Sequence, residues 1–143
     1  MKLLFENWRK YLTEAQVRWK HPDISAEIGE FRRHAPRFEL SAEELEEYVK
    51  SNGQLIPMSR ELYDTLQNTQ MREVNSVEDL DRIGKENNKD FEGIKQGIEA
   101  GSQFNAPIVV EKEGESPWLV AGNTRLVAAA AYGITPEVWY VKI

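Results

Sequence analysis

The C-terminal third of the chain constrains the fold most, because it alternates β-branched runs with one alanine-rich run. Residues 106–111 (Ala-Pro-Ile-Val-Val-Glu) and 117–121 (Pro-Trp-Leu-Val-Ala) predict two strands joined by a turn at Gly114. Residues 126–132 favour a helix, since alanine is the strongest helix former. Residues 137–143 predict a last strand. The order predicts an α+β fold in which the alanine face packs on a small mixed sheet.

The middle of the chain predicts a series of capped helices. Ser41 and Glu44 have capping-box spacing, and we expect Gly53 to end that helix with a left-handed cap. Further helices are expected after Pro57-Met58-Ser59, after Ser76 and around Phe91. The helical half therefore precedes the strands, and 143 residues suit a single domain, expected over residues 15–143.

Composition limits the functions open to the chain. It has 24 acidic and 18 basic residues and a net charge of −6, which counts against general nucleic-acid binding. Cysteine is absent, so disulfides, thiolate metal sites and thiol nucleophiles are excluded. The two histidines cannot form a His-based zinc site without carboxylates or waters. No apolar run is long enough to span a membrane.

Charged residues elsewhere give no specific site. Many carboxylates of the helical region fall in first turns or on solvated faces, so we assign no metal ligand and no catalytic residue among them. A basic cluster lies close to Phe31 and Phe38 and is the sole support for a nucleic-acid-binding or nuclease function. Such a cluster is more typical of a solvated helix face. Its members are Arg32, Arg33, His34 and Arg37.

Residues Gly122 to Arg125 lie where the second predicted strand meets the alanine-rich helix. Gly122 permits a tight turn, and a helix starting at or near Thr124 would present unpaired backbone N–H groups and the positive end of its dipole. The Thr124 hydroxyl and the Arg125 guanidinium would add donors for a phosphate. Asn123 or Thr124 can equally act as a plain N-cap, and Arg125 as a surface salt-bridge partner. Phosphate binding and helix capping both remain open.

The same region, residues 88–143, resembles the ParB/sulfiredoxin-like superfamily. The helix around Phe91 resembles the family helix that leads into its Pro-Ile-Val strand. In that family the Gly-x-x-Arg segment binds nucleotide phosphates. The resemblance therefore implies that Gly122, Asn123, Thr124 and Arg125 bind a nucleotide or phosphate. The other matching residues are Ala106–Val110, Val120, Ala121, Leu126, Ala128, Ala129 and Gly133–Ile134.

The resemblance also bears on activity. It implies a phosphotransferase or nucleotide hydrolase, with Mg²⁺ brought by the nucleotide. Sulfiredoxin activity is excluded, because Asn123 and Thr124 stand where that enzyme needs a cysteine. The second arginine of the chromosome-partition CTPases is absent, and no room is expected for their DNA-binding domain. A faint upstream match at Ala35-Pro36-Arg37 would place a helical insertion before Pro107.

The N-terminal residues form a separate amphipathic segment. Leu4, Phe5, Trp8, Tyr11 and Leu12 recur at helical spacing and predict a helix that packs on the domain or on a partner. The segment also resembles the capsid-targeting leader of tailed-phage internal head proteins, cut after a Leu-x-Glu sequence such as Leu12-Thr13-Glu14. That resemblance implies a leader over residues 1–14. It also implies a location in the host cytoplasm or in a phage head, and a capsid or host protein partner. A non-enzymatic interaction protein is thus the alternative to a nucleotide-binding domain.

Overall fold

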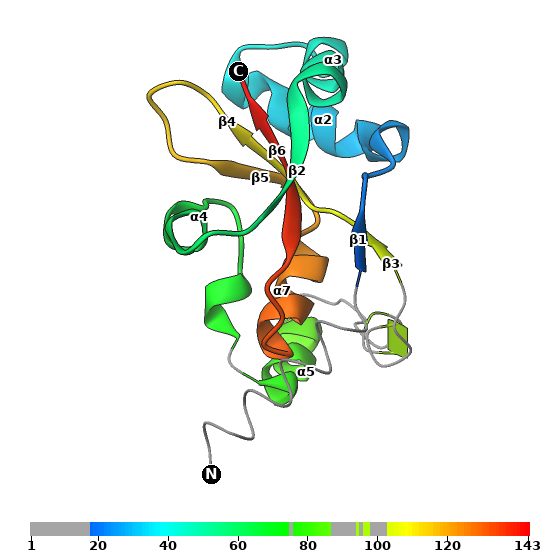
Figure 1. The fold of residues 1–143 in the computed structure, drawn as a ribbon, viewed down its shortest axis with the longest axis vertical. Coiled ribbons are helices and arrows are strands. Elements are labelled where there is room, and N and C mark those ends of the chain that lie inside the picture. Colours follow the sequence, from blue (N-terminus) through cyan, green and yellow to red (C-terminus); the bar gives the residue numbers. More distant parts are fainter. Residues whose placement is uncertain (1–17, 75, 87–93, 95, 98–102) are drawn as a thin grey trace. The chain divides into compact units, whose positions relative to one another are not determined.

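The computed structural model describes residues 18–74, 76–86, 94, 96–97 and 103–143. The chain forms two compact units (Figure 1). The first, here called the sheet unit, contains Lys20–Asn68, Asn105–Gly122 and Glu137–Ile143. The described residues of the second, the helical unit, fall within Met1–Trp19, Thr69–Phe104 and Asn123–Pro136. The predicted leader at 1–14 and most of the expected helix around Phe91 lie outside the described residues.

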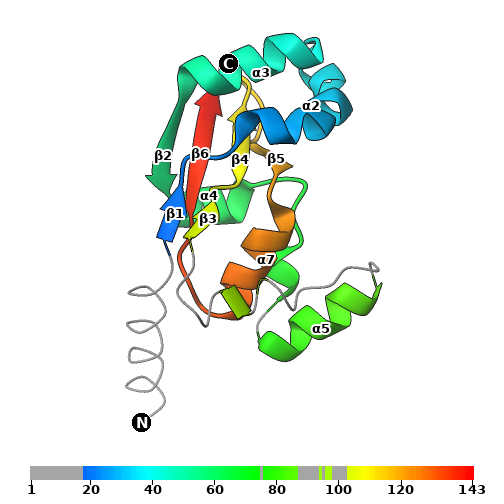
Figure 2. The same cartoon turned by 90° about the vertical axis from the view of Figure 1, so that its right-hand side faces the viewer.

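The sheet unit is built on four strands in the order β2-β6-β4-β5 (Figure 2). β2 (Gly53–Pro57) is antiparallel to β6 (Glu137–Lys142), and β6 is parallel to β4 (Ile108–Glu111). β4 is antiparallel to β5 (Trp118–Ala121). The predicted α+β class and mixed sheet are confirmed. β2 has no counterpart in the sequence prediction.

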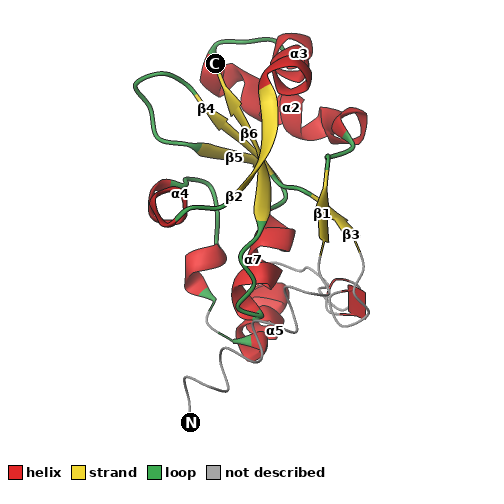
Figure 3. Ribbon diagram, viewed as in Figure 1, coloured by secondary structure: helices red, strands yellow, loops and turns green. Residues whose placement is uncertain are grey.

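Helices cover one face of this sheet (Figure 3). They are α2 (Ile28–His34), α3 (Ala42–Asn52) and the short 3₁₀ helices η1 (Ile24–Glu27) and η2 (Ala35–Phe38). The predicted capping box is present at the start of α3, where Ser41 and Glu44 bond each other's backbone N–H. The apolar core between helices and sheet holds Ile24, Phe31, Ala35, Phe38, Leu45, Val49, Ile108, Val110, Val120, Ala121 and Val141.

The opposite face of the sheet carries the alternate residues of each strand, because successive side chains of a strand point to opposite faces. The segment around α4 (Arg60–Thr65) contributes the buried side chains Leu62 and Leu66. After α4, the Gln67 N–H donates to the Pro117 carbonyl at 2.9 Å, and the Gln67 carbonyl accepts from the Leu119 N–H at 3.0 Å. These bonds fix the end of α4 to the β5 edge.

The expected left-handed cap at Gly53 is wrong. Gly53 has φ −81° and ψ 153°, an extended conformation, and it begins β2 directly after α3. A Cβ atom there would overlap the Trp139 indole. The Trp139 Nε1–H donates to the Val49 carbonyl at 2.8 Å. Glycine is therefore required by the close approach of an indole rather than by a turn.

The helical unit contains η3 (Met71–Glu73), α5 (Val77–Glu86) and α7 (Asn123–Ala131). α7 contacts both η3 and α5, and Leu80 and Ile83 of α5 are buried. Gly133, with φ 69°, follows the end of α7 as expected. The expectation that the alanine face of α7 packs on the sheet stays a prediction.

A separate two-stranded sheet pairs β1 (Arg18–Lys20) with β3 (Gln103–Asn105). Its aromatic side chains, Trp19 and Phe104, have ring centroids 5.9 Å apart. Within the part of the chain that the structure describes, no helix has the length and hydropathy needed to cross a bilayer.

Candidate functional site

The predicted strand–glycine–helix order is present at residues 121–123. β5 ends at Ala121, Gly122 has φ 99°, and α7 begins at Asn123, one residue before the expected start. A positive φ favours glycine, because it has no Cβ to clash with the backbone. The first backbone N–H groups of an α-helix have no acceptor within the helix. An anion at the start of α7 could accept hydrogen bonds from such groups, and the phosphate site there stays a prediction.

The Asn123 side chain makes three hydrogen bonds inside the helical unit. Its Oδ1 accepts from the Thr69 hydroxyl and from the Gln70 backbone N–H, both at 3.0 Å. Its Nδ2 donates to Gln70 Oε1 at 3.2 Å. The amide group thus ties the turn before η3 to the first turn of α7. Sequence reasoning did not find Thr69 or Gln70, because 53 residues separate Gln70 from Asn123 and no local pattern connects them.

Thr124 and Arg125 are half-buried in the first turn of α7. Arg125 makes at least one interaction within the protein. Of the four predicted site residues, Gly122 supplies the turn and Asn123 supplies structural hydrogen bonds. The backbone N–H groups at the start of α7, the Thr124 hydroxyl and the Arg125 guanidinium are the donors on which phosphate binding would depend.

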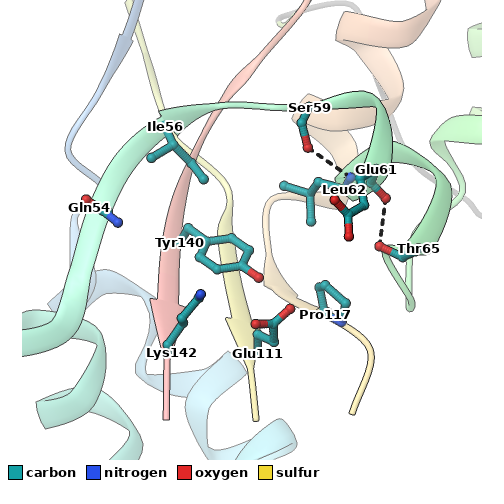
Figure 4. Close-up of a pocket in the computed structure, with 10 residues that line it drawn as sticks. All are labelled: Gln54, Ile56, Ser59, Glu61, Leu62, Thr65, Glu111, Pro117, Tyr140 and Lys142. Atoms are coloured by element: carbon teal, nitrogen blue, oxygen red, sulfur yellow. Dashed lines mark hydrogen bonds between the residues drawn. The ribbon is translucent and has the colours of Figure 1, made fainter. Parts of the chain in front are cut away.

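A second candidate site is a pocket of about 410 Å³ in the sheet unit (Figure 4). It lies on the sheet face opposite α2 and α3, where side chains of β2, β4 and β6 meet those of the α4 segment. Sequence reasoning did not identify it, because no local pattern brings α4 to this face. The lining residues are Gln54, Ile56, Ser59, Glu61, Leu62, Thr65, Glu111, Pro117, Tyr140 and Lys142.

Strand register fixes the polar groups of this pocket. Gln54 pairs with Tyr140 across β2 and β6, and Glu111 pairs with Lys142 across β4 and β6. Burial raises the pKa of Tyr140 well above its ordinary value of 10.0, and a hydrogen bond and the charge of Glu111 raise it further. The Glu61 charge adds a smaller contribution in the same direction. The phenol is therefore neutral at physiological pH and can donate a hydrogen bond.

The basic cluster predicted on α2 and η2 is used partly for packing. His34 Nδ1 accepts from Trp118 Nε1–H at 3.2 Å, and His34 Nε2 lies 3.3 Å from a Glu30 oxygen. The Arg37 guanidinium lies 3.5 Å from the centroid of the Trp118 ring. Arg32 and Arg33 are exposed. These contacts favour the interpretation of this cluster as a solvated helix face over apolar neighbours.

Among the described residues, no group of three or more His, Cys, Asp or Glu side chains could hold a metal ion. No protein-family model matches this chain, and comparisons with curated proteins and with solved structures found no significant match.

Proposed function

We propose that the chain is a small ParB/sulfiredoxin-like protein that binds a phosphate group, free or on a nucleotide, at the start of α7. The observation that carries the proposal is the junction at Gly122. A residue with φ 99° leads directly into the first turn of a nine-residue helix. The order β4, β5, Gly122, α7 and β6 also agrees with what the sequence resemblance implies.

The chemistry would come from the backbone more than from side chains. The N–H groups of residues 123–125 and the positive end of the α7 dipole attract an anion, and the Thr124 hydroxyl adds a donor. The net charge of −6 opposes anion binding at long range, so these local donors would have to provide the affinity. Only the family resemblance implies a phosphoryl-transfer or hydrolysis reaction, and we assign no described residue as its catalytic base.

Titration with CTP, ATP, GTP and inorganic phosphate, each with Mg²⁺, tests the proposal. A ligand at 100 times its Kd should stabilise the protein by about 2.7 kcal/mol in a melt. Replacing Arg125 by Ala should weaken binding by about 1.5–3 kcal/mol, the typical value of a charged hydrogen bond. Arg125→Lys should restore part of this loss, because it keeps the charge without the planar fork.

Asn123 offers a matched pair of variants. Asn123→Asp keeps an acceptor for Thr69 and Gln70 and places a negative charge at the helix start, so it should retain the fold and lose phosphate affinity. Asn123→Ala leaves both donors without their acceptor and should lower the free energy of unfolding by about 1–2 kcal/mol. If Asn123→Asp melts like wild type and binds nucleotide as tightly, phosphate does not bind at this turn.

The alternative is a non-enzymatic interaction protein, packaged in a phage head or bound to a host factor. The hydrogen bonds of Asn123 to Thr69 and Gln70 favour it, because they give this motif residue a structural role that needs no ligand. An absence of nucleotide binding by the wild type, together with unfolding of Arg125→Ala, would support this alternative.

A further inference from the structure

We infer that the pocket of the sheet unit is a binding site for a small organic cation, an aliphatic amine or guanidine, held by Glu61, Glu111 and Tyr140. None of the residues proposed for phosphate binding lines this pocket. The inference is therefore independent of the proposed function, and it concerns a ligand of opposite charge.

The pocket is built from elements held in fixed register. β2, β6 and β4 are adjacent strands of one sheet, and the bonds of Gln67 to Pro117 and Leu119 fix the end of α4 beside β5. A volume of about 410 Å³ lies within the range of pockets that hold small molecules. The floor and the α4 wall come from one compact unit, so the ligand would bind to a largely preformed site.

Carboxylates dominate the charge of the lining. Glu61 comes from α4 and Glu111 from β4, and Figure 4 shows Glu111 beside the Tyr140 hydroxyl on the sheet and Glu61 on the α4 side of the pocket. No ion pair with another described residue neutralises either carboxylate. Lys142 is the one basic lining residue and, like Glu61, is exposed, so the lining has two carboxylates against one ammonium. A cation placed between Glu61 and Glu111 would satisfy both carboxylates.

Tyr140 and the apolar residues define the rest of the ligand. An aromatic ring attracts a cation over its face. Near Tyr140, a cation would gain this cation–π attraction together with the Coulomb attraction of the two carboxylates. Ile56, Leu62 and Pro117 add apolar wall suited to an aliphatic chain. An ammonium or guanidinium on a short alkyl chain matches both parts of the lining.

The hydroxyl groups of the lining do not favour an anion. The Ser59 hydroxyl accepts from the Leu62 N–H at 3.1 Å, and the Thr65 hydroxyl donates to the Glu61 carbonyl at 2.8 Å. Both belong to the local structure of α4. A phosphate in this pocket would face two carboxylates with Lys142 as its cationic partner, so we expect phosphate to bind elsewhere.

Calorimetric titration with butylamine and butylguanidine tests the inference, with butanol and butyrate as neutral and anionic matches. The cations should bind, and butanol and butyrate should not. Glu61→Gln and Glu111→Gln should each weaken cation binding about tenfold or more. Glu43→Gln removes the same charge from α3, which covers the opposite sheet face, and should leave cation binding unchanged.

Two results would overturn the inference. One is a wild type that shows no cation binding at millimolar concentration, or that binds butanol as well as butylamine. The other is cation binding that Glu61→Gln and Glu43→Gln reduce equally, which would indicate attraction by net charge alone. A melt of each variant shows that it folds. If Glu111→Gln does not fold, the titration of Glu61→Gln still tests the inference, because Glu61 is exposed and its replacement should not affect folding.

Discussion

At the scale of single residues, the strongest constraint is the contact between Gly53 and Trp139. The pair lies at the start of β2, where the Trp139 indole occupies the space of a side chain and bonds the last turns of α3 through Val49. Sequence reasoning identified Gly53 as special but assigned the wrong cause. A glycine followed by a strand and a glycine at a helix cap look alike in sequence, since the indole that decides between them lies far along the chain.

Gly53→Ala should destabilise the protein because its Cβ would displace the Trp139 indole and break the bond to the Val49 carbonyl. We expect a loss of about 1–3 kcal/mol in the free energy of unfolding, measured by urea denaturation. Gly29→Ala is the control, because no atom lies within 4 Å of the added Cβ and the site is in α2. It should be neutral or stabilising by up to about 1 kcal/mol. Equal effects of the two variants would contradict the packing described for Trp139.

At the scale of elements, the sequence predicted those features that residues close together in the chain determine. The capping box of α3, the helix that begins after Ser59 and the β4–β5 hairpin with its turn at Gly114 were all predicted and are present. The pairing of β2 with β6 was not predicted, because it depends on residues 80 or more positions apart. The bond between His34 on α2 and Trp118 on β5 has the same long-range origin.

The His34–Trp118 bond predicts a pH dependence of stability. Burial lowers the pKa of His34 below its usual 6.5; Arg33 and Arg37 also lower it, and Glu30 opposes the shift. A proton on Nδ1 would remove the acceptor for Trp118 Nε1–H. The unfolded chain therefore binds the proton more readily. This part of the stability is fully present above pH 6.5 and is lost as the pH falls through the folded pKa of His34.

Urea denaturation of wild type and His34→Gln between pH 7.5 and pH 5 measures this contribution. The wild type should lose stability relative to the variant as the pH falls below 6.5, because glutamine has no proton to gain. A constant difference between the two proteins across that range would show that His34 does not titrate against Trp118.

At the scale of the whole molecule, the α+β class followed from sequence, whereas the pocket did not. Val138, Tyr140 and Lys142 are alternate residues of β6 and share one sheet face, which becomes more polar toward the C-terminal end of the strand. Only the three-dimensional path of the chain brings Glu61 of α4 over that face. The junction at Gly122 was found because its signal is contiguous, and the partners of Asn123 were missed because theirs is not.

Deletion of residues 1–14 tests the leader hypothesis at this scale. The apolar stripe of the segment ends at Leu12, and a leader should not contribute to the folded domain. We expect the melting temperature to change little. A loss of several kcal/mol would instead show that Phe5, Trp8 and Leu12 are core residues, because burying each large side chain contributes about 1.5–3 kcal/mol.

The most direct test of phosphate binding is an amide-resolved NMR titration of the full chain with inorganic phosphate and then with CTP and Mg²⁺. The backbone amides of Asn123, Thr124 and Arg125 should shift in a saturable way, because their N–H groups would donate to the anion. The amides of α5 should stay in place, and Asn123→Asp should suppress the response. Amides at 123–125 that do not move at millimolar phosphate or nucleotide, or saturable shifts confined to other residues, would contradict a phosphate site at the start of α7.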